Sequence, residues 1–416
     1  MSATVLILGS GGREHALAWA CQQSAAVSRV VVAPGNPGMA NSGVETSALD
    51  LADLDAVCRL ADEAACSLVV VGPEGPLVQG AADRLRASGH AVLGPDQGPA
   101  QLEGSKSYAK SVMTACAVPT ARFATVCTER DLLAAIDRFG GTVALKADGL
   151  AQGKGVLIAG DLAEARQAGQ RWLRTFGRLV VEERLFGPEI SLHALVSGET
   201  VCALPLSRDY KRRFDGDLGP NTGGMGSMAP VRCPWAAADL ADLAIAPVAR
   251  HLVAKGHPFS GVLYAGLILT ADGPRVLEYN VRFGDPETQA LVGLLSPDLY
   301  DWLLATASGR LASLDEMPLV STHTAAVVVV ADRYPDGGGA AQGILPMATN
   351  HPGRLFWSGV SGRPDQLMAG SGRVATAVGI GPTAALARTE AYRLARSVRF
   401  SGASFRSDIG LGSTTN

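Results

Sequence analysis

Glu278, Asn280 and Arg282 alternate with apolar residues in Val276–Phe283, which makes them the strongest candidates for chemistry in this chain. The alternation predicts a strand with the three polar side chains on one face. A carboxylate and an amide oxygen placed together suit Mg²⁺, which binds a few protein oxygens and completes its shell with water and phosphates. Arg282 would add a bidentate anion clamp in the same space. The alternative is an edge strand with a solvated polar face.

A glycine-rich loop, Gly149–Gly155, follows a predicted strand at 142–146. We interpret it as a flexible lid over triphosphate oxygens, with Lys146 and Lys154 supplying positive charge. It is not a Walker A loop, because its glycine spacing is one residue short and Gly155 stands where Ser or Thr is required. A surface hairpin is the alternative interpretation.

Two further segments carry polar groups beside predicted strands. The strand at 179–182 leads into a turn, where Glu182 could accept from an adenine amino group and Glu189 from ribose hydroxyls. Residues 209–212 and 219–226 are polar and glycine-rich, with little hydrophobic pattern. Long irregular stretches inside a domain are usually functional, so we interpret these as substrate-binding backbone.

The first glycine cluster, Gly9–Gly12, follows the strand 5–8 and opens a helix, as in loops that bind anions through backbone N–H groups. A dinucleotide fingerprint is disfavoured, because Glu14 occupies its third glycine position and no acid ends the second strand. We expect a phosphate or a phosphorylated sugar here. An NAD(P)-dependent oxidoreductase is a less favoured alternative.

The order of the predicted elements indicates an α/β protein. Strands at 5–8, 30–33, 68–71 and 91–93 alternate with helices, which is typical of a parallel Rossmann-like sheet with ligands at the carboxyl ends of its strands. We divide the chain into an N-terminal domain (1–103), a nucleotide-binding domain (104–318) with a smaller lid part (about 123–190), a C-terminal α/β domain (319–411) and a tail (412–416).

Composition excludes several classes of protein. The 416 residues are 47% hydrophobic and 18% charged with net charge −3, so no electrostatic argument favours nucleic acid or an anionic membrane. The seven cysteines are scattered and form no CxxC pair, which predicts reduced thiols in a cytoplasmic protein. The chain begins without the features of a signal peptide and contains no apolar run of membrane-spanning length.

Four features resemble the ATP-grasp fold in their order and spacing. They are Lys146, the glycine-rich loop 149–155, the hinge whose two glutamates, Glu182 and Glu189, are seven residues apart, and the strand that carries Glu278 and Asn280. Three segments, 102–106 (LEGSK), 219–226 (GPNTGGMG) and 282–289 (RFGDPETQ), closely resemble the phosphoribosylamine–glycine ligase family. The resemblance implies ATP-dependent ligation of glycine to 5-phosphoribosylamine through glycyl phosphate in purine biosynthesis. Another ATP-grasp carboxylate–amine ligase is the nearest alternative. We expect a monomer, with a dimer as the alternative.

The resemblance also assigns roles to residues. Glu278 and Asn280 become ligands of Mg²⁺ or Mn²⁺, while Arg282, Lys146 and Asp285 act in catalysis, Asp285 as the candidate for the glycine ammonium. The expected ATP-binding residues are Lys106, Lys146, Gly149, Gln152, Gly153, Lys154, Gly155, Glu182, Glu183, Leu185 and Glu189. The expected substrate-binding residues are Gly11, Gly12, Arg13, Asn36, Gly38, Pro73, Glu74, Gly75, Asp209, Asn221, Thr222, Gly223, Gly224, Met225 and Arg282.

The sequence departs from the family pattern at a few positions. Tyr210 stands where the family usually has His, and Met228 where an aromatic residue is common. Gly261–Ala271 lacks the acid that many ATP-grasp enzymes carry one strand earlier, which predicts few protein ligands per metal. Asp285 could alternatively cap a helix that starts at Pro286.

Overall fold

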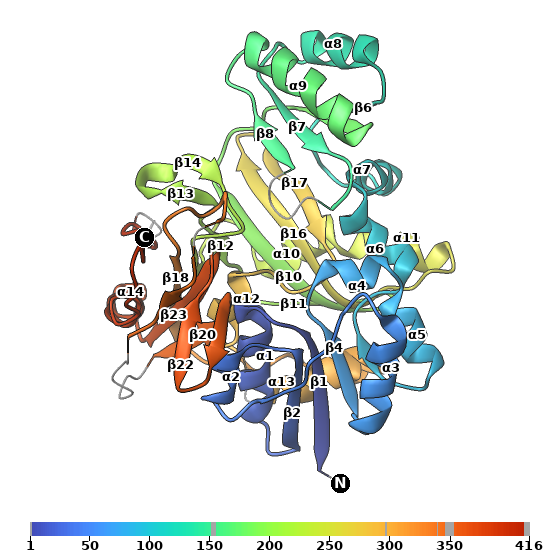
Figure 1. Cartoon of the computed structure of the whole chain (residues 1–416). Helices are drawn as coiled ribbons and strands as arrows, with labels where there is room; N and C mark the ends of the chain where they lie inside the picture. The colour runs from blue at the N-terminus through green and yellow to red at the C-terminus, as the bar shows by residue number, and fades with distance from the viewer. Residues whose placement is uncertain (1, 151–154, 296–297, 339, 346–352, 412–416) are drawn as a thin grey trace.

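The computed structural model describes residues 2–150, 155–295, 298–338, 340–345 and 353–411. Figure 1 shows the N-terminal part (blue) and the C-terminal part (red) next to each other, below a long central sheet. A small α/β lid stands at the opposite end of that sheet (Figure 1). The chain therefore has the α/β architecture that the sequence predicts.

The N-terminal part is a five-stranded parallel sheet in the order β3-β2-β1-β4-β5. All four predicted strands are present, and their apolar residues are buried between helices. The strands are β1 (Ala3–Gly9), β2 (Val27–Pro34), β3 (Glu45–Thr46), β4 (Leu68–Val71) and β5 (Val92–Leu93). The helices are α1 (Gly12–Gln22), α2 (Pro37–Ala40), α3 (Leu54–Glu63), α4 (Glu74–Val78) and α5 (Ala81–Ala87).

The lid is a four-stranded antiparallel sheet in the order β6-β9-β7-β8, with helices α8 and α9 packed on it. Asp161 caps the start of α9, and Gly177 ends it in the left-handed conformation. The glycine-rich loop joins the paired strands β7 and β8, although its residues Gln152, Gly153 and Lys154 lie outside the described part of the chain. The elements are β6 (Phe123–Val126), α8 (Glu129–Arg138), β7 (Val143–Ala147), β8 (Val156–Ile158), α9 (Leu162–Phe176) and β9 (Leu179–Glu183).

The central sheet is antiparallel, in the order β11-β10-β16-β17. Its strands are β10 (Glu189–Ser197), β11 (Thr200–Ala203), β16 (Ser260–Thr270) and β17 (Gly273–Asn280). The helices of this part are α6 (Gln97–Gly104), α7 (Lys106–Ala115), α10 (Ala237–Ala244), α11 (Ala246–Ala254), α12 (Glu287–Leu291) and α13 (Leu299–Ala307).

The predicted strand Val276–Phe283 was wrong at its end, because β17 stops at Asn280. There the Val281 N–H donates to the Glu103 carboxylate at 2.7 Å, and the Phe283 carbonyl accepts from Arg13 at 3.1 Å. The chain therefore leaves the sheet toward the N-terminal part, and Arg282 follows the strand instead of belonging to it.

The C-terminal part is built around a sheet in the order β12-β15-β18-β23-β20, whose first two strands come from the middle of the chain. The polar segment between residues 209 and 226 is thus not structureless as predicted, since backbone pairing orders most of it. Its elements are β12 (Arg208–Asp209), β13 (Arg212–Phe214), β14 (Leu218–Asn221) and β15 (Gly226–Ala229). The remaining elements are β18 (His323–Val330), β19 (Gln342–Gly343), β20 (Arg354–Trp357), β21 (Val360–Arg363), β22 (Gln366–Ala369), β23 (Arg373–Gly381) and α14 (Ala384–Ala395), with 3-10 turns at Asp215–Asp217 and Leu311–Ser313.

Candidate active site

A cavity of about 780 Å³ opens where the lid, the central sheet and loops of both terminal parts meet. The lid, the hinge after β9 and the central sheet all contribute apolar residues to its wall, including Ala144, Ile158, Leu185, Ile268 and Leu277. The rest of the wall is strongly charged. Such a combination can hold a flat heterocycle at one end and phosphates at the other.

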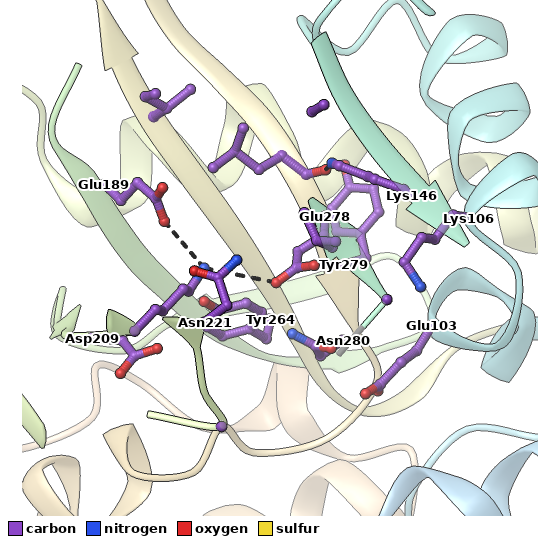
Figure 2. Close-up of a pocket in the computed structure, with 18 of the residues that line it drawn as sticks. Glu103, Lys106, Lys146, Glu189, Asp209, Asn221, Tyr264, Glu278, Tyr279 and Asn280 are labelled. Carbon is purple, nitrogen blue, oxygen red and sulfur yellow. Dashed lines mark hydrogen bonds and ion pairs between the residues drawn. The ribbon is translucent and has the colours of Figure 1, made fainter. Parts of the chain in front are cut away.

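Glu278 and Asn280 both line this cavity, as their shared strand face predicts (Figure 2). Burial opposes ionisation of Glu278, but Lys211, Lys146 and Lys106 overcome it and lower the pKa of its carboxyl. No group of three His, Cys, Asp or Glu side chains suited to a metal exists within the described residues. The two oxygen donors fit a hard divalent cation that takes its other ligands from phosphates and water.

Lys211 lies between the two glutamates that the sequence assigned to metal and ribose. Its Nζ is 3.1 Å from Glu189 and 3.8 Å from Glu278. Burial would lower the pKa of Lys211, but the carboxylates around it, Glu189 first, raise it well above its usual range. Lys211 is therefore a permanent positive charge beside the candidate metal ligands.

Two buried lysines share the carboxylate of Glu182. Lys146 Nζ lies 2.9 Å from Glu182 Oε1, and Lys110 Nζ lies 3.1 Å from Oε2. Both oxygens thus face lysines, whereas the sequence had assigned this carboxylate to adenine. Lys110 also donates to Thr120 at 2.6 Å, and burial lowers its pKa to about 8. Sequence reasoning missed Lys110, since it lies within an ordinary helix, α7, without a local motif.

Other predicted ATP-binding residues also surround the cavity. Lys106 donates to the Gly149 carbonyl at 2.9 Å, which connects helix α7 to the start of the glycine-rich loop. Glu183 is paired with Arg122 at 2.6 Å, so its charge is already balanced. The cavity wall includes Lys106, Lys146, Gly149, Gly155, Glu182, Glu183, Leu185 and Glu189.

The N-terminal loops contribute only part of the residues predicted from them. Arg13, Pro73 and Glu74 line the cavity, whereas Gly11, Gly12, Asn36, Gly38 and Gly75 are not among its lining residues. The Asn36 amide donates to the carbonyls of Ser10 and Trp357 and accepts from Gly38, so it fastens this loop to the C-terminal part.

Glu14 explains why the first glycine cluster lacks its third glycine. Its buried carboxylate accepts from the Gly11 N–H at 2.7 Å and fills the space beside Gly9 and Gly72. A Cβ atom at Gly72 would lie 2.1 Å from Glu14 Oε1, which leaves no room for a side chain there. The loop is thus closed by a carboxylate of its own helix.

Arg282 is held by two acids of the N-terminal side. Its guanidinium donates to Glu103 at 2.7 Å and to Glu74 at 3.2 Å, and it lies 3.4 Å from the Asn280 side-chain oxygen. Burial, the main cause, raises the pKa of Glu103 to about 7 although Arg282 opposes the shift. Arg282 therefore orients Asn280 in addition to facing the cavity.

Asp285 forms an ion pair with Arg373 at 3.1 Å and accepts from Gln289 at 2.7 Å. It does not cap the following helix, since α12 begins after Pro286 without a side-chain cap. Arg373, which lies 88 residues further along the chain, also donates to the Gly223 carbonyl at 2.6 Å.

Of the predicted substrate-binding residues nearby, Asp209, Asn221, Thr222 and Gly223 line the cavity and Gly224 and Met225 do not.

Tyr210 and Met228, the two departures from the family pattern, are both buried in the hydrophobic core of the C-terminal part. The Tyr210 hydroxyl accepts from the Gly410 N–H at 3.0 Å. Neither residue belongs to the cavity wall. Their effect on a substrate would therefore be indirect, through the neighbouring Asp209 and Ser227.

Comparison with known proteins decides the family. Three domain profiles match consecutive parts of the chain: the N domain of phosphoribosylglycinamide synthetase over residues 3–103, its ATP-grasp (A) domain over 104–288 and its C domain over 324–412. The phosphoribosylamine–glycine ligase of Corynebacterium ammoniagenes is 40% identical, covering 98% of this chain and 97% of its own. That of Mycobacterium leprae is 42% identical with the same coverage. The chain belongs to the phosphoribosylamine–glycine ligase family.

Solved structures agree with the family at the level of the fold. The crystal structure of the phosphoribosylamine–glycine ligase from Thermotoga maritima superimposes with a TM-score of 0.85 at 34% identity, over 98% of this chain and all of that one. The biotin carboxylase domain of Hydrogenobacter thermophilus 2-oxoglutarate carboxylase, solved with ADP and magnesium, gives 0.74 at 16% identity and shows a shared fold alone. The chain is thus a ligase of the ATP-grasp superfamily, whose chemistry uses ATP and a divalent metal. No described helix has the length and apolar character needed to cross a bilayer.

Proposed function

We propose that this ligase joins glycine to 5-phosphoribosylamine, with cleavage of ATP to ADP and phosphate. The observation that carries the proposal is the grouping of Glu278, Asn280, Lys106, Lys146 and Lys211 around one cavity. Two oxygen ligands beside three ammonium groups provide the charge that a triphosphate and a developing acyl phosphate require. The apolar residues that also line the cavity, Leu185 among them, support adenine binding.

The proposed reaction has two steps. A glycine carboxylate oxygen attacks the γ-phosphorus, ADP leaves, and glycyl phosphate forms. The amine of phosphoribosylamine then attacks the acyl carbon, phosphate leaves with that carboxylate oxygen, and the nitrogen loses one proton as the amide forms. Lys146 and Lys106 would position the phosphates, and Arg282 would hold Asn280 in place. A Mg²⁺ or Mn²⁺ ion bound by Glu278 and Asn280 would neutralise phosphate charge.

Exclusion of water matters, because water would hydrolyse the acyl phosphate. The proposal assigns this task to the loop from Gly149 to Gly155, which joins two strands of the lid.

Arg13, Pro73 and Glu74 would face the sugar phosphate. The domain boundary at residue 103 would separate the loops that bind the sugar phosphate from the residues that bind ATP. The boundary at residue 318 would mark the start of the C-terminal domain. A cytoplasmic location and a monomeric state complete the proposal, and light scattering would test the latter.

Phosphate release from Mg-ATP, with glycine and freshly generated phosphoribosylamine added singly and together, tests this function. We expect release only with both substrates, together with one glycinamide ribonucleotide per ATP. Release that ignores both would leave the ATP-grasp fold in place and refute the substrates. Replacement of Mg²⁺ by Mn²⁺ in the same assay would establish the metal preference.

A further inference from the structure

Lys110, Glu182 and Lys146 form a buried cluster of three charges where helix α7 meets two strands of the lid. The two ammonium groups lie 3.1 and 2.9 Å from the two oxygens of the one carboxylate. The side chains are only 2%, 1% and 6% exposed, so water screens their charges little. With two cations and one anion, this charge cluster carries one positive charge in excess. That charge is available to attract an anion.

Lys110 is held by partners inside the protein. Its ammonium donates to the Thr120 hydroxyl at 2.6 Å and lies 5.8 Å from the centre of the Phe123 ring, a favourable position for a cation. The Thr120 hydroxyl donates in turn to the Val276 carbonyl at 2.6 Å. Burial lowers the pKa of Lys110 to about 8, with Glu182 opposing the shift, so the ammonium is charged at pH 7. Lys110 is therefore a fixed charge rather than a mobile one.

Lys146 is the member of the cluster that acts on the cavity. Its ammonium donates to the Leu277 carbonyl at 2.8 Å, directly before Glu278 in the chain. Figure 2 shows Lys146 next to Glu278. Burial opposes ionisation of Glu278, but Lys211 and then Lys146 lower the pKa of its carboxyl. The charge of Lys146 thus reaches the candidate metal ligand, where phosphates are expected.

The ratio of two lysines to one glutamate decides how much of the Lys146 charge an anion can use. Because Glu182 is shared with Lys110, it compensates Lys146 only in part. Without Lys110, Glu182 and Lys146 would form a neutral buried pair. A phosphate would then have to compete with a buried carboxylate for the same ammonium group.

We propose that Lys110 is a counter-charge for Glu182 that keeps Lys146 available to nucleotide phosphates. Lys110 is a positioning residue in this proposal, since it acts through Glu182 and Lys146 and does not contact the nucleotide. Glu182 then has an electrostatic role in place of the adenine contact that the sequence predicts. The inference rests on the part of the proposed function that places ATP phosphates beside Lys146, and it does not depend on which substrates are joined.

The test measures ADP binding by calorimetry at pH 7.0, without substrates, and thermal unfolding of each variant. Lys110→Met brings the cluster to zero net charge, and we expect the dissociation constant for ADP to rise about 10- to 100-fold, the scale of a neighbouring charge. Adding Glu182→Gln restores one positive charge and should recover most of the lost affinity. Wild-type affinity in Lys110→Met would overturn the proposal, as would a double variant as weak as the single one, because removing a charge does not repair lost packing.

Glu182→Gln alone gives a result that does not depend on the folding of Lys110→Met. It keeps both lysines, so we expect ADP to bind at least as tightly as to wild type. An adenine contact through Glu182 would instead make binding weaker, and that result would overturn the proposal. Adenosine has no phosphate, so its affinity should be the same in all variants. An equal loss of adenosine and ADP affinity in Lys110→Met would show distortion of the whole site and refute the charge effect.

Two further lysine variants serve as controls. Lys255→Met, at an exposed position after helix α11, should bind ADP like wild type. Lys146→Met should bind ADP more weakly. If it does not, the phosphate position in the proposed function is wrong, and the present proposal fails with it. If Lys146→Met weakens binding and Lys110→Met does not, only the role of Lys110 is refuted.

Discussion

The Lys146 ammonium lies 2.8 Å from the carbonyl oxygen of Leu277, so a lid lysine is hydrogen-bonded to the strand that carries Glu278. The same ammonium is paired with Glu182 at 2.9 Å on the neighbouring lid strand. Lys146 thus connects the lid to the central sheet at the point where phosphates are expected. A change at this residue should affect both the charge of the site and the position of the lid.

Lys146→Met should lower turnover by at least about 10²-fold, because it removes a preorganised charge from the phosphate site. Glu182 would still be paired with Lys110, so folding should be preserved. Steady-state turnover and thermal unfolding would be measured together. Lys255→Met, at an exposed position after helix α11, is the matched control and should behave like wild type. Equal turnover in both variants would remove Lys146 from the mechanism.

Glu278→Ala should also lower turnover at least about 10²-fold and shift activation to higher Mg²⁺ concentration, since one of two oxygen ligands is lost. Titration of Mg²⁺ at fixed ATP measures both effects. Near-normal turnover at saturating Mg²⁺ would contradict the assignment of Glu278 as a ligand.

Arg282→Met should destabilise the protein by about 3–5 kcal/mol, because Glu103 and Glu74 would lose their buried counter-charge. Urea unfolding at pH 7.5 measures the loss. Adding Glu103→Gln to Arg282→Met should recover part of it, since one unpaired charge disappears. A double variant no more stable than the single one would show that the guanidinium acts by packing alone.

His15 should make the protein acid-sensitive. Its Nδ1 accepts from the Trp357 N–H at 2.9 Å and its Nε2 is 3.0 Å from the Ser42 hydroxyl, an arrangement that requires the neutral ring. Burial lowers the pKa of His15 from 6.5 to about 4. Between these values the unfolded chain binds more protons, so the free energy of unfolding falls as pH decreases.

The expected slope from His15 approaches about 1.4 kcal/mol per pH unit inside that window, and its contribution is complete above pH 6.5. His15→Gln should be less stable than wild type at pH 7.5, yet the difference should shrink as pH decreases toward 4. Urea unfolding at several pH values checks this. A difference that is constant with pH would exclude titration of His15 as its cause.

Local sequence patterns determined most of the fold correctly. Strand β4 was predicted to the residue, because four consecutive apolar residues end at a Gly-Pro turn. The end of β17 was missed, since it depends on Glu103, which lies 178 residues from Val281. Alternation of polar and apolar residues shows which side chains share a face, but it cannot show where a distant side chain intercepts the backbone.

The same limit applies to the site. Glu278 and Asn280 were placed correctly on one face because their spacing is local. Arg373 and Lys110 carried no local signal, and their importance comes from partners distant in sequence or in another element. Glu182 was assigned to adenine from the sequence, because its two lysine partners lie in other elements and carry no local signal.

The most direct test of the central claim uses glycine labelled with ¹⁸O in its carboxylate. If ATP activates that carboxylate, each glycinamide ribonucleotide formed should be accompanied by inorganic phosphate containing one ¹⁸O atom, which mass spectrometry detects. Phosphate that is free of ¹⁸O while product accumulates would contradict activation through glycyl phosphate.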